Sequence, residues 1–412
     1  MQEKTTDFAW GPIFITAFGP SILFGIAQGT ILPVIALTAI KLGASYAVSG
    51  VIAALIGIGV LSNNIPAAVF TRHVGERKAL VGTSIFSIAG LLLCIVAANV
   101  WVLACGVLMQ GLSTSVVNLA RQSYIINVVP ASLRARAFSI MGGTQRMGVF
   151  VGPFLGAGAI HFMGLKGAYW VAIIATIATG ILCFFIPELL DEGPDTVPES
   201  ESRAGATSKT QGRARALQHL WQIIVENRNV LLTLGLGVLC LGALRAARPV
   251  AIPLWAKYIG LDPTTTAIIF GLSAAIDIFF FYPAGMIMDK YGRGWIAVPS
   301  VLLMALAYGL MPFTASIFAF VLTTILLGIG NGISAGLVMT LGADAAPDDK
   351  KIEFLGVWRV FADAGHSIGP LLISLVTALS TLGLGILFIA STGLIAAWIF
   401  ARGLLATTPR QR

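Results

Sequence analysis

Long apolar stretches follow one another along almost the whole chain, separated by short polar or glycine-rich breaks. Each stretch is long enough to cross a bilayer as a helix, which takes about 20 residues. Apolar residues are continuous within the stretches, whereas the strands of a membrane β-barrel alternate apolar and polar positions. The pattern therefore predicts twelve spanning helices, at 12–38, 46–70, 79–98, 101–128, 137–161, 168–187, 230–256, 265–288, 295–313, 316–342, 354–379 and 383–401.

Composition supports an all-α membrane protein and excludes a soluble enzyme. Of the 412 residues, 57% are hydrophobic and 11% are charged, with a mean hydropathy of +0.90. Soluble domains carry about 25% charged residues. The first ten residues lack the basic start and the cleavage site of a secretory signal, so we keep the first span as part of the fold.

The net charge of +8 comes from an uneven distribution of basic residues. Eighteen Lys and Arg fall on the side of the predicted spans that holds both termini, against Lys41, Lys166 and Lys257 on the other. This bias predicts cytoplasmic termini and removes the case for a nucleic-acid partner. With no large outer domain expected, the inner (plasma) membrane of a bacterium is the simplest location for this multi-pass chain.

The chain divides into two similar parts. Residues 188–229 are rich in charge, Pro, Gly, Ser and Thr, and predict a cytoplasmic linker between a six-helix half at 1–187 and a second six-helix half at 230–412. An offset of 217 residues pairs six glycines and three prolines of the two halves, including Gly25 with Gly242 and Pro153 with Pro370. Two parallel repeats are typical of secondary transporters with a binding site between the halves.

Two loops and one span carry a family resemblance. The loops Ala68–Leu80 and Gly285–Arg293 resemble the G-x-L-x-D-R-x-G-R-K signature of the major facilitator superfamily, with Asp289 as the acid of the second copy and Arg72 in its place in the first. The segment Gly148–Ala157 is similar to the G-x-x-x-G-P-x-x-G-G motif of the drug/proton antiporters in that superfamily. The resemblance implies alternating access, a gating role for Asp289, and motif roles for Gly148, Gly152, Pro153 and Gly156. Independently, glycines at every fourth position allow close helix packing.

Charges inside the predicted spans are costly, at about 2.5–3.5 kcal/mol each at the bilayer centre, and indicate function. Asp277 and Arg146 lie at similar depths in spans eight and five, which meet in the fold that the sequence resembles, so we expect them to face each other. Asp277 is the first candidate for a proton carrier, and the alternative is a static contact between the halves. Arg359, Asp363 and His366 share one helix face, as either a structural ion pair or a second proton site.

Arginines outnumber acids within the spans, five to two. Arg245 and Arg248 have no acid on their own span and are candidates for binding the substrate, together with Gln28 and Asn331. We expect Arg121, near one end of its span, to extend toward the membrane interface.

These observations predict a transporter and not an enzyme. The chain has no nucleotide-binding loop, and its four cysteines have no metal-binding spacing, so we expect no cofactor and no metal. The main hypothesis is a monomer in lipid that exports small amphipathic compounds in exchange for protons. The alternatives are an organic-anion carrier that uses the intramembrane arginines, and a membrane receptor or scaffold that does not transport.

Overall fold

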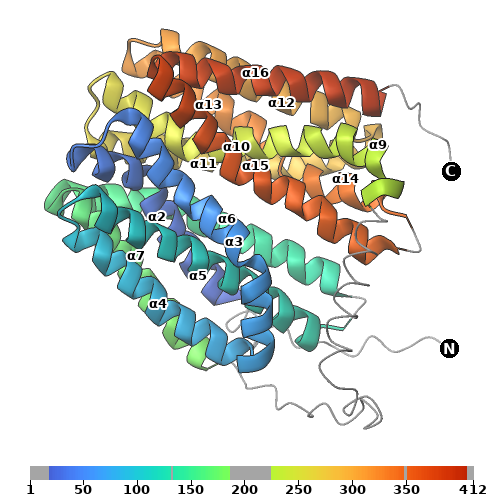
Figure 1. Cartoon of the computed structure of the whole chain (residues 1–412), viewed down its shortest axis with the longest axis horizontal. Coiled ribbons are helices and arrows are strands. Elements are labelled where there is room, and N and C mark those ends of the chain that lie inside the picture. The colour runs from blue at the N-terminus through green and yellow to red at the C-terminus, as the bar shows by residue number, and fades with distance from the viewer. Residues whose placement is uncertain (1–17, 131–132, 186–223, 348–349, 406–412) are drawn as a thin grey trace.

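The computed structural model describes residues 18–130, 133–185, 224–347 and 350–405, and these residues are almost entirely helical (Figure 1). In chain order the elements are α2 (Gly19–Lys41), α3 (Tyr46–Val74), α4 (Glu76–Val96), α5 (Val100–Val128), α6 (Arg134–Met163), α7 (Leu165–Phe184), α9 (Arg228–Val230), η4 (Leu231–Gly235), α10 (Leu236–Tyr258), α11 (Pro263–Tyr291), α12 (Gly294–Leu310), η5 (Met311–Phe313), α13 (Ile317–Ile333), α14 (Leu337–Ala345), α15 (Lys351–Leu379), α16 (Leu382–Phe400) and η7 (Ala401–Leu405).

Twelve segments within the described ranges are long and apolar enough to span a membrane. The expected all-α membrane fold is therefore confirmed, and from the second span onward the predicted ends lie within four residues of the observed ones. Residues 12–17 of the first predicted span, and most of the predicted linker, lie outside the described residues.

The 217-residue offset also relates the helices. Residues 46–74 of α3 correspond to 263–291 of α11, and α5 corresponds to 317–345, which α13 and α14 share. Gly43 and Gly260 end equivalent helices with φ of +88° and +85°, a conformation that L side chains rarely adopt. We call α2–α7 the N-half and the helices from α9 onward the C-half.

Equivalent polar residues begin equivalent helices. The side chains of Ser45 and Asp262 accept hydrogen bonds from the backbone N–H groups of Val48 and Thr265, at the starts of α3 and α11. Such N-caps satisfy backbone donors that have no partner within the helix. Because each half has six spans, Gly19 and Leu405 lie on one side of the bundle, the terminal side, and these caps lie on the opposite, far side.

Glycines bring the backbones of two helix pairs together. A Cβ atom on Gly148 or Gly152 of α6 would meet backbone atoms of α2 near Gly25 and Gly29. The equivalent contact in the C-half joins Gly365 of α15 to the α10 backbone. Each half therefore has a closely packed inner helix pair that faces the other half.

The halves pack through α3 against α15 and α6 against α11. In Figure 1 the N-half, coloured blue to green, lies below the C-half, coloured yellow to red. On the far side, Ala36 of α2 belongs to the apolar core of the C-half and Ala267 of α11 to a core of the N-half. A third core on the terminal side contains only N-half residues. Among the described residues, the apolar cores of the two halves therefore meet on the far side and not on the terminal side.

Candidate functional site

A cavity of about 550 Å³ lies between the halves. This volume is typical of a site for a small molecule. Polar residues of seven helices line it: Gln28, Thr114, Asn118, Gln145, Arg146, Arg245, Arg248, Asp277, Asn331, Asp363 and His366. On its far side, Tyr46 of α3 and Tyr258 of α10 are in edge contact with ring centres 6.3 Å apart, and Trp255 stacks on Tyr258.

Asp277 joins the two halves at the centre of this cavity. Its side chain is buried, with one carboxylate oxygen 3.1 Å from Nη1 of Arg146 in the N-half. The other oxygen lies 3.4 Å from Nη1 of Arg248 and accepts a hydrogen bond from the amide of Asn331. The structure thus brings Arg146 and Asp277 face to face, as their depths along the chain led us to expect.

Arg245 differs from its neighbours in its partners. Its Nε donates to the side-chain oxygen of Asn331 at 3.1 Å, and no carboxylate among the described residues pairs with it. Arg146 and Arg248 lie over the rings of Phe281 and Phe270 and share one carboxylate between them. The centre of the cavity therefore carries an excess of positive charge.

The polar face of α15 forms a second group at the interface. Arg359 Nε lies 3.7 Å from the Asp363 carboxylate, and the amide of Asn64 from α3 donates to the same carboxylate at 3.0 Å. His366 lines the cavity, with its Nδ1 2.9 Å from the carbonyl oxygen of Ala362. Arg359 is half exposed and donates to Gln122 of the N-half at 3.3 Å.

Sequence reasoning missed Asn64 and Gln122, although both bond across the interface. A signal was present for Asn64, because Asn63 and Asn64 are adjacent amides within an apolar span. Gln122 follows Arg121 near the end of its span and has no such signal.

The expectation for Arg121 was wrong. Its side chain is 5% exposed and lies among α2, α5 and α6, over the ring of Phe24. It donates to Gln145 at 2.8 Å, while its Nε and Nη1 have no hydrogen-bond partner among the described residues. Counting residues gave its depth but not its direction, which is toward the bundle interior.

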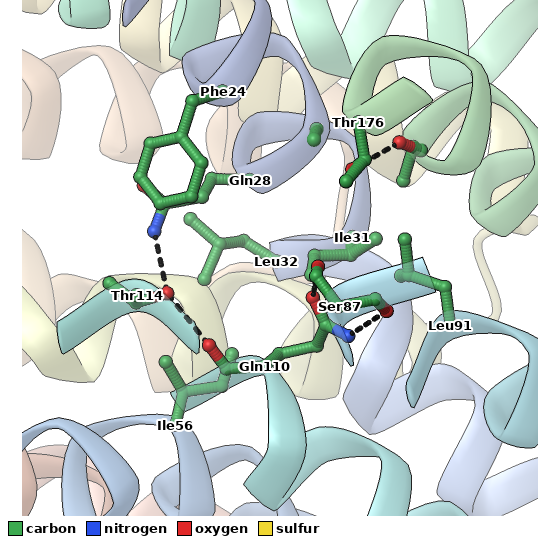
Figure 2. Close-up of a pocket in the computed structure, with 12 residues that line it drawn as sticks. Phe24, Gln28, Ile31, Leu32, Ile56, Ser87, Leu91, Gln110, Thr114 and Thr176 are labelled. Atoms are coloured by element: carbon green, nitrogen blue, oxygen red, sulfur yellow. Dashed lines mark hydrogen bonds between the residues drawn. The ribbon is translucent and has the colours of Figure 1, made fainter. Parts of the chain in front are cut away.

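A small pocket of about 30 Å³ opens beside the central cavity within the N-half (Figure 2). The two cavities share Gln28, Leu32, Ile56 and Thr114 as lining residues. Figure 2 shows the bond from Gln28 to Thr114 and, deeper in the pocket, the reciprocal pair of Ser87 and Gln110.

The glycine motif and the loop acid lie elsewhere. Gly148 and Gly152 contact α2, Gly156 meets the Thr30 side chain, and Pro153 is inside α6. Asp289 is exposed at the terminal-side end of α11, and no ion pair joins it to the described residues. A charged contact on that side is instead made by Arg293 and Asp344, with Nε and Oδ2 2.7 Å apart.

No group of three or more His, Cys, Asp and Glu side chains in the described ranges could bind a metal ion. The arrangement of charges and amides suits the binding of a small molecule and the exchange of a proton.

Known proteins with similar sequences and folds are transporters. An uncharacterized MFS-type transporter of Bacillus subtilis (strain 168), YfkF, is 24% identical over 353 residues, which cover 84% of this chain and 83% of that one. A probable sugar efflux transporter of Pasteurella multocida (strain Pm70) is 28% identical over 122 residues, 30% of each protein. The crystal structure of a D-xylose-proton symporter has the same fold, with a TM-score of 0.71, 16% identity and coverage of 94% of this chain and 96% of that chain.

The family model for the Major Facilitator Superfamily matches residues 18–247 and 234–412, which together include nearly the whole chain. The protein is thus a multi-pass membrane transporter rather than an enzyme, and it belongs to the major facilitator superfamily.

Proposed function

We propose that this protein exports small amphipathic compounds in exchange for protons. The observation that supports the proposal is the buried Asp277, which bonds Arg146 of the N-half and Arg248 of the C-half at once. A proton on this carboxylate removes its charge and weakens the bond between the halves. Proton binding is thereby linked to the separation of α6 from α11, and hence to alternating access.

Asp363 is the second proposed proton site. It bonds Asn64 across the interface, so its protonation weakens the α3–α15 contact as protonation of Asp277 weakens the α6–α11 contact. His366 lies one turn further along the same helix and lines the same cavity. Arg359, with bonds to Asp363 and Gln122, is the proposed gating residue on the terminal side.

The distribution of basic residues supports a cytoplasmic location for the terminal side, by the positive-inside rule. In that orientation the ring contacts of Tyr46, Trp255 and Tyr258 lie toward the outside. The inner membrane of a bacterium is the proposed location, in keeping with the bacterial relatives. We take the structure as an inward-facing state that receives substrate from the cell.

A second candidate function is the transport of organic anions. It is favoured by Arg245, whose guanidinium lines the cavity and has no carboxylate partner among the described residues. An anionic group next to Arg245 would balance the excess of positive charge.

The test uses bacterial cells that express the protein and are loaded with N-phenylnaphthylamine, a neutral lipophilic dye. Exporting cells should retain less than half of the dye in control cells, and either an uncoupler or Asp277→Asn should remove this difference. Asp262→Asn is the matched control, because Asp262 caps the same helix far from the cavity and asparagine is also a good cap.

Equal dye levels with and without the protein would contradict the export of amphipathic compounds. Uptake of radiolabelled benzoate by vesicles, lost in Arg245→Gln, would then support the anion carrier. If neither compound is transported, both proposed substrate classes are excluded.

A further inference from the structure

Each half forms one wall of the central cavity, and equivalent positions of the two walls form a hydrogen bond. The chemical groups that form this bond differ between the walls. Gln28 donates to the hydroxyl of Thr114 at 3.2 Å in the N-half. At the equivalent positions, 217 residues later, Arg245 donates to the amide oxygen of Asn331 at 3.1 Å. At this bond the C-half therefore has a cationic donor, while the N-half has a neutral amide donor.

Hydrogen bonds in the N-half wall all run in one direction. Arg121 donates to the oxygen of Gln145 at 2.8 Å, the nitrogen of Gln145 donates to the oxygen of Gln28 at 3.3 Å, and Gln28 donates to Thr114. Thr114 in turn donates to the backbone oxygen of Gln110 at 2.8 Å. We call these side chains, from Arg121 to Thr114, the amide chain.

Arg121 determines this direction. A guanidinium group only donates, so Gln145 must turn its oxygen toward Arg121 and its nitrogen toward Gln28. A chain of amides alone could reverse by rotating each group by about 180°. No carboxylate among the described residues pairs with the buried charge of Arg121 to offset its desolvation, and burial without a partner is costly. What Arg121 does contribute is the orientation of the Gln145 and Gln28 amides.

The amides keep hydrogen-bonding capacity on the cavity side. Gln28 and Gln145 each use one N–H and one oxygen lone pair within the chain, which leaves one of each for another molecule. Asn118, which also lines the cavity, accepts from Arg121 at 3.4 Å. A hydroxyl group both donates and accepts, so it complements these amides better than a charged group does.

The small pocket of Figure 2 adds room next to the same residues. It opens beside Gln28 and Thr114, and its volume of about 30 Å³ is enough for a group of one or two heavy atoms. A hydroxyl or hydroxymethyl substituent fits that space and lies within reach of the Gln28–Thr114 pair.

We propose that the N-half wall is a subsite for the hydroxyl groups of a polyhydroxylated substrate, and that the buried Arg121 is the positioning residue that fixes the orientation of its amides. The proposal rests on the proposed function in taking the central cavity as the site of the transported compound. It adds a substrate class, small molecules with several neighbouring hydroxyl groups.

The test compares two probes that share a skeleton. Phenyl β-D-glucoside carries four hydroxyl groups, and 2-phenoxytetrahydropyran has the same two rings without them. Titration calorimetry on the purified full-length protein in detergent, with a blank of empty micelles, gives a Kd for each. We expect the wild-type protein to bind the glucoside at least tenfold more tightly, because a site built for hydroxyl groups rejects analogues that lack them.

Arg121→Met should reduce this ratio to below threefold, while the Kd of the hydroxyl-free probe stays unchanged. A purely structural role would instead weaken both probes together. Arg402→Met is the matched control, because Arg402 also lies over an aromatic ring, that of Trp398, but is outside the cavity. If Arg121→Met does not fold, Gln28→Leu decides the question, since Gln28 is the central member of the amide chain.

A ratio near one in the wild-type protein, no binding of either probe, or an unchanged ratio in both variants would overturn the proposal. The measurement needs no proton gradient. Failure of proton-driven export would therefore leave this result intact.

Discussion

At the scale of single residues, Asp277 is shared by donors from three helices: Arg146 of α6, Arg248 of α10 and Asn331 of α13. Removing one member of a buried ion pair is more costly than the pair is worth, because the other charge is left without compensation. The loss of the carboxylate affects two arginines at once, whereas the loss of one arginine leaves Asp277 with two donors.

We therefore predict that Asp277→Ala destabilises the protein more than Arg248→Met does. The expected costs are about 3–5 kcal/mol for the aspartate and less than half of that for the arginine. Melting temperatures of the purified variants in detergent measure the order. Equal shifts, or a larger shift for Arg248→Met, would contradict the shared-carboxylate arrangement.

Sequence reasoning succeeded for Arg146 and Asp277 because depth along a helix is a matter of counting, and the fold fixes which helices meet. It failed for Arg121 because the direction of a side chain depends on what surrounds its helix. Arg121 lies against Phe24 and Gln145, and neither contact can be predicted from the spacing of residues along the chain.

At the scale of helices, α6 approaches α2 closely because its glycines carry a hydrogen atom where other residues carry a Cβ atom. A Cβ at Gly148 would overlap the α2 backbone near Gly25, while a Cβ at Gly158 of the same helix would meet no atom within 4 Å. The identical substitution should therefore have opposite effects at the two positions.

Gly148→Ala should destabilise the protein by about 1–3 kcal/mol, the range for an overpacked site. Gly158→Ala should leave stability unchanged or raise it by up to about 1 kcal/mol, because alanine has the higher helix propensity. Thermal unfolding of the two variants side by side checks this. Similar melting temperatures would show that α2 and α6 can separate without loss.

Helix ends were largely predictable, because they are marked locally. Ser45 and Asp262 each precede an apolar run, and Gly43 and Gly260 follow one, so both the sequence and the structure change at the same points. The break between α13 and α14 was not predicted, since 316–342 reads as one apolar run.

At the scale of the whole molecule, apolar packing joins the two halves on the far side. A Cβ built on Gly50 of α3 lies 3.5 Å from the Cβ of Ser374 on α15, within the range that a disulfide spans. Alternating access requires these two helices to separate on that side during the cycle.

We predict that the double variant Gly50→Cys/Ser374→Cys forms a disulfide under mild oxidation and loses transport by at least tenfold. A reductant should restore activity, and each single variant should retain it. Efflux of the dye before and after reduction measures both effects. Full activity of the oxidised, cross-linked protein would show that the far side does not open.

Twofold organisation of the chain was predictable from matched glycines and prolines, because the repeat preserves backbone positions. The chemistry of the cavity was not, because the repeat does not preserve it: Gln28 corresponds to Arg245 and Thr114 to Asn331. The structure shows that each of these pairs is bonded and lines the cavity, with a neutral amide donor in one wall and a cationic donor in the other.

The far-side packing has a consequence for the cell that houses this protein. On the far side the apolar cores of the two halves interlock at Ala36 and Ala267, and Tyr46 and Tyr258 of opposite halves are in contact, so packed side chains separate the cavity from that side. There is therefore no open pathway for ions across the bilayer. Many copies of the protein can reside in one membrane without dissipating the membrane potential. The same seal limits throughput, since each turnover moves no more than the contents of a single chamber.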